Sequence, residues 1–96
     1  MQSVPRHVLE LVRSFQTLLS EKVRHQLDAG FFDTDDLIES ILNGSLIKKE
    51  KDETKMAKYK YTIIGPARSG IPLYSCGKVV RWAGKSYFII TFHEAR

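Results

Sequence analysis

Three histidines and one cysteine are the residues of this 96-residue chain best suited to acid–base or nucleophilic chemistry. His7, His25, His93 and Cys76 do not have the spacing of a metal site, and no CxxC or HxxxH pattern occurs. Cys76 lies beside Gly77 with no helix terminus to activate its thiol, so we interpret it as a packed structural cysteine. No glycine-rich phosphate loop follows a strand. The sequence therefore predicts neither a metal centre nor a cofactor.

Metal-independent cleavage of RNA is one chemistry that these side chains could perform. It needs an acid or base near the 2′-hydroxyl and the leaving oxygen, and cations that stabilise the charge on the phosphorane. His93, in the C-terminal stretch YFIITFHEAR, is the candidate catalytic acid or base. The alternative is a strand-end residue hydrogen-bonded to its surroundings. Candidate phosphate-binding cations in the second half of the chain are Lys58, Lys60, Arg68, Lys78 and Arg81.

Charge is divided unevenly along the chain. Residues 1–43 carry four Lys/Arg and seven Asp/Glu, a net charge of −3, whereas residues 44–96 carry eleven and four, a net charge of +7. A basic half favours a polyanionic partner such as RNA, because phosphate contacts are largely Coulombic. Tyr59, Tyr61 and Trp82 could stack on its bases. The alternative is that the lysines are solvated and protect sheet edges, while the aromatic residues belong to the core.

The elements that would position these side chains change character halfway along the chain. Apolar residues recur at three- and four-residue steps over residues 4–28, which predicts helix. Ser20 could restart this helix, so one bent helix and two short helices both fit. The stretch FFDTDDLIESILNG predicts a helix over residues 34–43, capped near Asp33 and closed at Gly44.

After Gly44 the apolar pattern has a period of two, which is typical of strands with one wet face. Four such strands over residues 45–95, joined by short turns, predict an antiparallel meander. The expected fold is α+β, with N-terminal helices packed on one face of a four-stranded antiparallel sheet. In the last strand, alternation places Phe88, Ile90 and Phe92 on one face, and Tyr87, Ile89, Thr91 and His93 on the other.

Length and composition bound the class of protein. A chain of this size predicts a single domain over residues 1–96. No apolar run approaches the roughly 18 residues of a membrane span, and Arg6, His7 and Glu10 interrupt the apolar stretch of a signal peptide, so we expect none. The lone cysteine excludes an internal disulfide, so we expect a cytoplasmic protein.

The order of these segments resembles a known family. The pieces DTDDLIESILNG, SLIKKE, YKYTIIG, PLYSCGKVV and YFIITFHEA, over residues of about 18 to 95, are similar to domain-of-unknown-function family 4258. This family comprises small bacterial domains related to RelE- and barnase-like ribonuclease toxins. The resemblance implies an RNA substrate and a neutralising, antitoxin-like protein partner.

The resemblance covers only half of the family's presumed site. The family usually has a histidine on the helix before the Gly turn and an arginine one helical turn later, and these positions are Lys22 and Gln26 here. The terminal position is kept as His93. If the domain cleaves RNA, His93 would act with a cation from this helix, for which Lys22 is the first candidate, followed by Arg24, with His25 as a second catalytic imidazole.

Two classes of function follow. The first is a toxin-like, RNA-directed domain, either an active metal-independent endoribonuclease or a degenerate one. The second is a non-catalytic interaction module that binds an acidic protein or nucleic acid through its basic sheet. In addition, the apolar stripe of residues 4–19 predicts a helical arm that could form a homodimer.

Overall fold

The structure is a computed structural model that describes residues 2–53, 57–81 and 84–95. Within these ranges there are three helices: α1 (Arg6–Arg13), α2 (Glu21–Asp28) and α3 (Thr34–Leu42). The strands in the same ranges are β1 (Gln2–Ser3), β2 (Thr17–Leu19), β3 (Ser45–Lys51), β4 (Tyr59–Pro66), β5 (Pro72–Arg81) and β6 (Lys85–Glu94). None of the helices described is long and apolar enough to cross a membrane.

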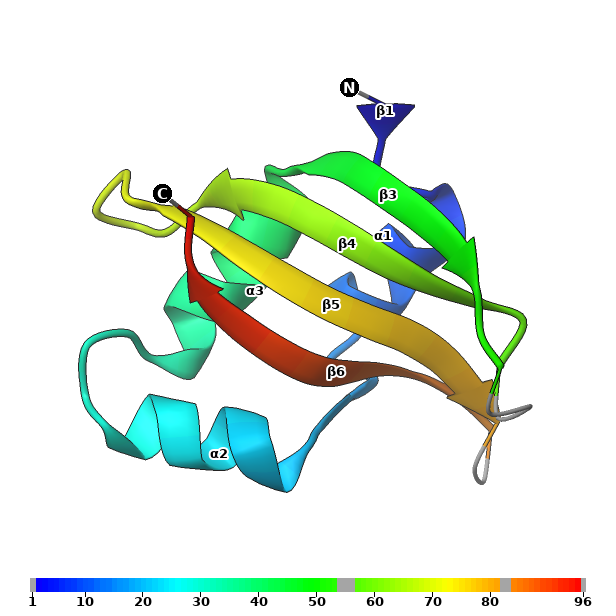
Figure 1. Cartoon of the computed structure of the whole chain (residues 1–96), viewed down its shortest axis with the longest axis horizontal. Helices are drawn as coiled ribbons and strands as arrows, with labels where there is room; N and C mark the ends of the chain where they lie inside the picture. Colours follow the sequence, from blue (N-terminus) through cyan, green and yellow to red (C-terminus); the bar gives the residue numbers. More distant parts are fainter. Residues whose placement is uncertain (1, 54–56, 82–83, 96) are drawn as a thin grey trace.

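The strands form one sheet, with the helices against one of its faces (Figure 1). The α+β class expected from the sequence is confirmed. Strands β3 to β6 pair antiparallel in chain order, as the predicted meander does. However, the sheet is wider than the four antiparallel strands expected and is mixed, because β1 pairs with β3 and β2 pairs in parallel with β6. These two edge strands have two and three residues, which are too few to show a period-two pattern.

The helical range expected over residues 4–28 is divided into two short helices with a strand between them. Phe15, two residues after the end of α1, lies in the left-handed region with φ of 58°, which turns the chain away from the helix axis. The next residues join the edge of β6: the Tyr87 amide donates to the Gln16 carbonyl, and the Ser20 amide donates to the Ile89 carbonyl. Ser20 then caps α2, since its side chain accepts from the Val23 amide. A long-range strand pairing therefore interrupts the helical pattern.

Helix α3 has the caps that its sequence predicts. Asp33 accepts from the Asp36 amide, and the Asp36 carboxylate accepts in return from the Asp33 amide, which forms a capping box. Leu37 and Ile41 are completely buried against the sheet. The helix ends at Leu42, one residue before the predicted boundary.

Two glycines let α3 approach β4 closely. A Cβ atom built on either Gly44 or Gly65 would collide with the backbone carbonyl oxygen of Ser40. Because backbone cannot move as a side-chain tip can, any larger residue would push the helix away from the sheet. The contact sets the height of α3 above the sheet, and with it the position of the loop that follows β4.

A β-bulge breaks the expected alternation along β6. The alternation predicts that Phe88, Ile90 and Phe92 share a face, but the residues buried in the core are Tyr87, Ile89 and Phe92. The pairing of β5 with β6 shifts at this point, so that Ile90 is the extra residue. One inserted residue moves every side chain before it to the other face of the sheet. The prediction was therefore wrong for this strand.

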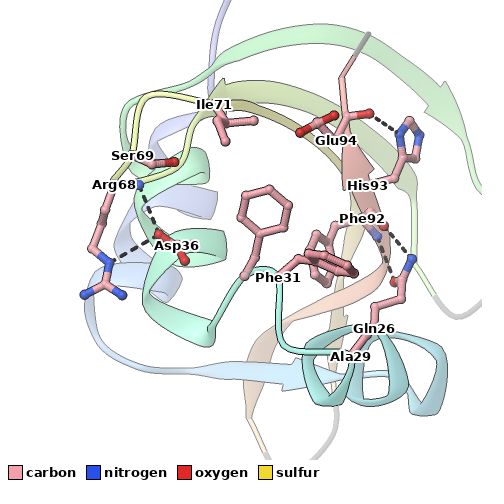
Figure 2. A pocket seen from close by; sticks show the side chains of 11 residues that line it. Gln26, Ala29, Phe31, Asp36, Arg68, Ser69, Ile71, Phe92, His93 and Glu94 are labelled. Carbon is pink, nitrogen blue, oxygen red and sulfur yellow. Dashed lines mark hydrogen bonds and ion pairs between the residues drawn. The ribbon is translucent and has the colours of Figure 1, made fainter.

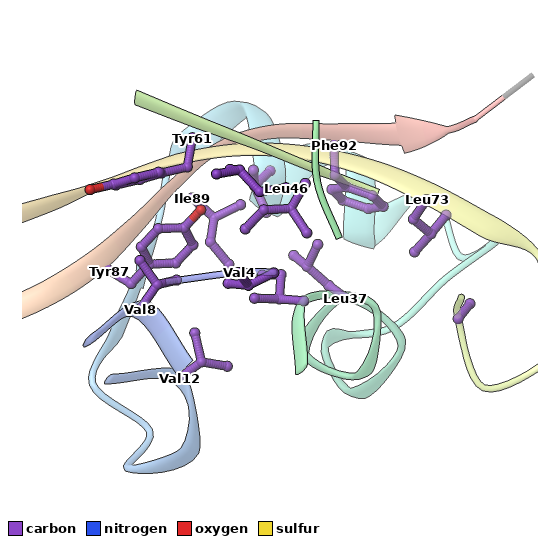
Figure 3. Packing of buried hydrophobic residues seen from close by; sticks show 14 residues of the cluster. Val4, Val8, Val12, Leu37, Leu46, Tyr61, Leu73, Tyr87, Ile89 and Phe92 are labelled. Carbon is purple, nitrogen blue, oxygen red and sulfur yellow. The ribbon is translucent and has the colours of Figure 1, made fainter. Parts of the chain in front are cut away.

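The hydrophobic core lies between the sheet and the helices (Figure 3). Helices α1, α2 and α3 contribute side chains that are fully buried, among them Val8, Val12, Val23, Leu37 and Ile41. The strands contribute Leu46, Tyr61, Ile63, Leu73, Tyr87, Ile89 and Phe92. The apolar stripe of α1 is thus packed inside its own chain, where it covers the sheet.

Candidate functional site

A basic cleft lies at the end of the sheet where β4 begins, β5 ends and β6 begins. Its volume is about 860 Å³. We call it the basic cleft, and its lining residues are His7, Lys49, Ala57, Lys58, Tyr59, Tyr61, Val79, Arg81 and Lys85. Four of these are Lys or Arg, and none of the described lining residues is Asp or Glu. The positive potential of the cleft is therefore not neutralised within its own walls.

Strand register gathers these side chains on the face of the sheet that carries the helices. Lys49 pairs with Tyr61, and Arg81 pairs with Lys85 across the last hairpin, so each pair shares a face. Side chains on the same face of the sheet as Tyr61 point toward the helices, and the first turn of α1 adds His7 beside them. The basic cleft is therefore formed where the strands extend past the helical layer.

Polar and aromatic contacts arrange the interior of the basic cleft. The Lys49 ammonium lies 4.2 Å from the centroid of the Tyr59 ring, a cation–π contact. His7 Nε2 and the Tyr61 hydroxyl are 3.3 Å apart, and their rings meet edge to face. Burial, and to a lesser extent the nearby Tyr59, raises the pKa of the Tyr61 phenol. Tyr61 therefore keeps its proton at neutral pH and can donate it in a hydrogen bond.

A second hollow, of about 1020 Å³, lies at the opposite end of the sheet, where β4 and β6 end (Figure 2). We call it the apolar pocket. Its lining residues are Gln26, Ala29, Phe31, Phe32, Asp36, Arg68, Ser69, Ile71, Phe92, His93 and Glu94. Two residues that the sequence singled out, Arg68 and His93, are thus brought together here.

Arg68 is held by carboxylates rather than directed at the pocket. Its Nε lies 3.2 Å from Asp36 Oδ1, its Nη2 hydrogen-bonds Asp33, and its Nη1 lies 4.0 Å from Asp35. The hydrogen bond that Arg68 donates to Asp36, and the charge of Asp33, raise the pKa of Arg68. Three carboxylates outweigh one guanidinium, so this predicted phosphate ligand lies in a locally acidic environment.

His93 also has local partners. Its ring is exposed, its Nδ1 lies 2.9 Å from the backbone oxygen of Glu94, and it packs against Tyr74 with centroids 5.4 Å apart. This is the hydrogen-bonded strand end that the sequence left open as the alternative. Of the described residues that line this pocket with His93, the Lys or Arg residue is Arg68, and its charge is balanced by carboxylates, so this described lining offers little positive charge to stabilise a phosphorane.

The α2 candidates are exposed on the surface of that helix. Lys22, Arg24 and His25 are exposed and are not among the residues that line the apolar pocket with His93. Gln26, which takes the place of the family's arginine, serves the fold. Its amide donates to the Phe92 carbonyl at 2.5 Å and accepts from the Phe92 amide at 3.3 Å, which fastens α2 to the edge of β6 (Figure 2).

The predicted cations of β5 have different environments. The side chain of Lys78 is only 8% exposed, and its ammonium lies 3.3 Å from the buried carboxylate of Asp52. We expected Lys78 to be a surface phosphate ligand, but its ammonium is instead buried beside this carboxylate. Arg81, in contrast, lines the basic cleft.

Sequence reasoning did not single out His7, Lys49 and Lys85 as a group. The +7 charge of the second half was the available signal, but only the register shows which of its lysines share a face. Of the aromatic residues named from the sequence, Tyr59 and Tyr61 line the basic cleft, and Trp82 lies outside the described residues.

The described residues contain no group of three or more His, Cys, Asp or Glu side chains that could hold a metal ion. The cleft could instead receive an anion through its lysines, its arginine and the imidazole of His7. No protein-family model, curated protein or solved structure matches this chain.

Proposed function

We propose that this chain is a toxin-like, RNA-directed domain that binds single-stranded RNA in the basic cleft. The observation that carries the proposal is the cleft's composition: four Lys/Arg side chains, a histidine and two tyrosines, with no carboxylate among the described residues that line it. The resemblance to family 4258 supports the same reading. It adds a bacterial, cytoplasmic setting and an antitoxin-like protein that neutralises the domain.

Both parts of a single-stranded RNA find partners in such a cleft. Lys49, Lys58, Arg81 and Lys85 can contact consecutive phosphates, and the gain comes largely from release of counterions. Tyr59, which is 40% exposed, can stack on an unpaired base. A duplex offers no free base face in its interior, so the aromatic residues favour a single strand.

If the domain cleaves its RNA, the geometry favours His7 over His93 as the acid–base residue. In the proposed step, His7 takes the proton of the 2′-hydroxyl, the 2′-oxygen bonds to phosphorus, and the bond from phosphorus to the 5′-oxygen breaks. The leaving 5′-oxygen takes a proton from water or from a lysine of the cleft, and the Tyr61 hydroxyl can donate a hydrogen bond to the developing phosphorane.

A non-catalytic interaction module is the second candidate. It is favoured by Gln26, which occupies the position of a family arginine and is engaged in backbone hydrogen bonds. Lys22 likewise takes the place of the family histidine. Such a module would use the same basic cleft to retain RNA without cutting it.

A binding experiment tests the shared part of the proposal. The double variant Arg81→Ala/Lys85→Ala removes two charges from the cleft, and Lys22→Ala/Arg24→Ala removes two exposed charges from α2 as a matched control. Binding of a fluorescein-labelled, mixed-sequence single-stranded RNA is measured by polarisation at several salt concentrations. We expect the cleft variant to lose affinity and to reduce the salt slope by about 1.4, that is about 0.7 for each contact. Equal losses in the two variants would contradict the proposed site.

A cleavage experiment separates the two candidate functions. The protein, its His7→Ala variant and its His93→Ala variant are incubated with the same RNA in the presence of a chelator. An active domain should lose about 10²–10⁴-fold in rate with His7→Ala and keep its rate with His93→Ala. The opposite order would restore His93 as the catalyst. Salt-sensitive retention of RNA without cleavage by any sample would support the interaction module.

A further inference from the structure

The apolar pocket has a composition that RNA binding at the other end of the sheet does not explain. Phe31 is 86% exposed although it is one of the largest apolar side chains, and Ile71, on the opposite wall, is 38% exposed. Figure 2 shows the side chains of Phe31 and Ile71 directed into the same hollow, which Phe92 also lines. Exposed apolar residues that gather around a depression mark an interaction site.

The walls of the apolar pocket are held in place before any ligand arrives. The two hydrogen bonds between the Gln26 side chain and the Phe92 backbone, one donated and one accepted by Gln26, fasten the α2 wall to β6. On the opposite side, both the backbone amide and the Nε of Arg68 donate to Asp36, which ties the β4–β5 loop to the first turn of α3. A preformed pocket costs its ligand less ordering entropy than one that must form on binding.

The charge beside the pocket is acidic. Asp33, Asp35 and Asp36 surround Arg68, which leaves a net formal charge of −2 in this cluster. The side chains of Asp33 and Asp35 are mostly exposed, so they can meet a ligand that lies across the rim. The pocket therefore repels the polyanion that the basic cleft attracts, and favours a ligand that combines apolar groups with positive charge.

We propose that the apolar pocket binds a basic peptide segment of a partner protein, with an aliphatic or aromatic side chain seated between Phe31 and Ile71 and flanking Lys or Arg residues facing Asp33 and Asp35. A macromolecular ligand fits better than a small one, because Phe31 stands at the rim and is covered only by a ligand that extends over the surface. The proposal is independent of RNA binding.

A second copy of this chain is a poorer occupant. A two-fold contact through this surface would place the three carboxylates of the cluster opposite those of the other copy. A contact between the apolar pocket of one copy and the basic end of another would be heterologous, and would build larger rings or open filaments rather than a simple dimer. A partner of different sequence avoids both problems.

The test uses the full chain, labelled with ¹⁵N, and three synthetic peptides of equal length. One carries Leu and Phe flanked by Lys and Arg, the second has the same apolar residues flanked by Glu, and the third has the basic flanks around Ala. The first peptide should shift the amide signals of Phe31, Ser69, Ile71 and His93 in a saturable way. The other two peptides should bind at least about tenfold more weakly than the first, which corresponds to a difference of at least about 1.4 kcal/mol in binding free energy.

Variants of two equally exposed phenylalanines locate the binding. Phe31→Ser should weaken the first peptide about tenfold, whereas Phe15→Ser, at a residue that is 85% exposed outside the pocket, should leave its affinity unchanged. The proposal is overturned if the acidic peptide binds as well as the basic one, if Phe31→Ser has no effect, or if no peptide shifts these signals. Shifts that depend on protein concentration without peptide would replace it with self-association.

Discussion

At the scale of single residues, the buried ion pair between Lys78 and Asp52 shows how burial decides the role of a charged side chain. Lys78 lies in the central strand β5, and Asp52 follows β3, yet their side chains are 8% and 1% exposed. Removal of two charges from water is costly, and their mutual attraction offsets this cost only while both partners are present. The pair therefore makes Lys78 necessary for the fold rather than available to a phosphate.

Lys78→Met should accordingly destabilise the protein without changing the affinity of the folded protein for RNA. We expect the free energy of unfolding to fall by about 3–5 kcal/mol, because the substitution leaves the Asp52 carboxylate buried without the ammonium. Lys60→Met, at the position that pairs with Lys78 in β4, serves as the control and should change stability by less than about 0.5 kcal/mol. Urea unfolding measures both. Similar stability of the two variants, with weaker RNA binding only for Lys78→Met, would instead make Lys78 an RNA ligand.

At the scale of elements, the N-terminus of α3 links a helix cap to the shape of the apolar pocket. The Asp36 carboxylate accepts from the Asp33 amide within the capping box and from Arg68 in the β4–β5 loop. These hydrogen bonds, that from Asp33 first, lower the pKa of Asp36 below its ordinary value of 3.8. One carboxylate thus stabilises the start of a helix and positions a loop more than thirty residues away.

The stability that Asp36 provides should depend on pH. Because its folded-state pKa is below the unfolded one, its contribution is fully present above the unfolded pKa and is lost as the pH falls from about 4 through the folded value. Asp36→Asn should therefore lower the melting temperature by several degrees at pH 7, but by progressively less as the pH falls below about 4.

Asp35→Asn is the matched control for this prediction. Asp35 is also in the first turn of α3, but its side chain is 80% exposed and lies 4.0 Å from Arg68. It should change the melting temperature little at either pH. A loss for Asp36→Asn that is the same at neutral and acidic pH would show that the neutral side chain matters and the ionised carboxylate does not.

At the scale of the whole molecule, the two surfaces lie at opposite ends of the sheet. The basic cleft is formed where β5 ends and β6 begins, and the apolar pocket where β4 and β6 end (Figure 1). The sheet runs between them, and its helix-facing side chains pack with those of the helices in the hydrophobic core. The opposite charges of the ends orient ligands of opposite charge toward different surfaces.

RNA and the basic peptide should therefore bind independently. With the basic cleft saturated by single-stranded RNA, the Kd of the peptide for the apolar pocket should change less than about twofold, after correction for direct binding between peptide and RNA measured without the protein. Titration of labelled peptide with and without RNA measures this. A larger change in either direction would reveal coupling between the two ends, and the Lys22→Ala/Arg24→Ala variant would test whether α2 carries it.

Several features were determined by the local sequence. The capping residues around Asp33 and the apolar spacing of Leu37 and Ile41 define α3, and the period of two after Gly44 defines the central meander. These signals are local, because a helix cap or an alternating strand involves residues close together in the chain. The α+β class follows from these signals, and the basic character of the second half follows from its composition.

Other features depended on contacts between distant residues. β2 exists because its backbone pairs with β6, which is about seventy residues away, and the bulge at Ile90 exists because of the register of β6 against β5. The same register decides where the candidate residues lie. It places His93 at the apolar pocket, away from the lysines, and places Lys49, Arg81 and Lys85 around His7. The sequence determines which side chains are present, but strand pairing and burial decide which of them share a surface. The free energies of pairing and burial depend on residues far apart in the chain, so no local pattern contains them.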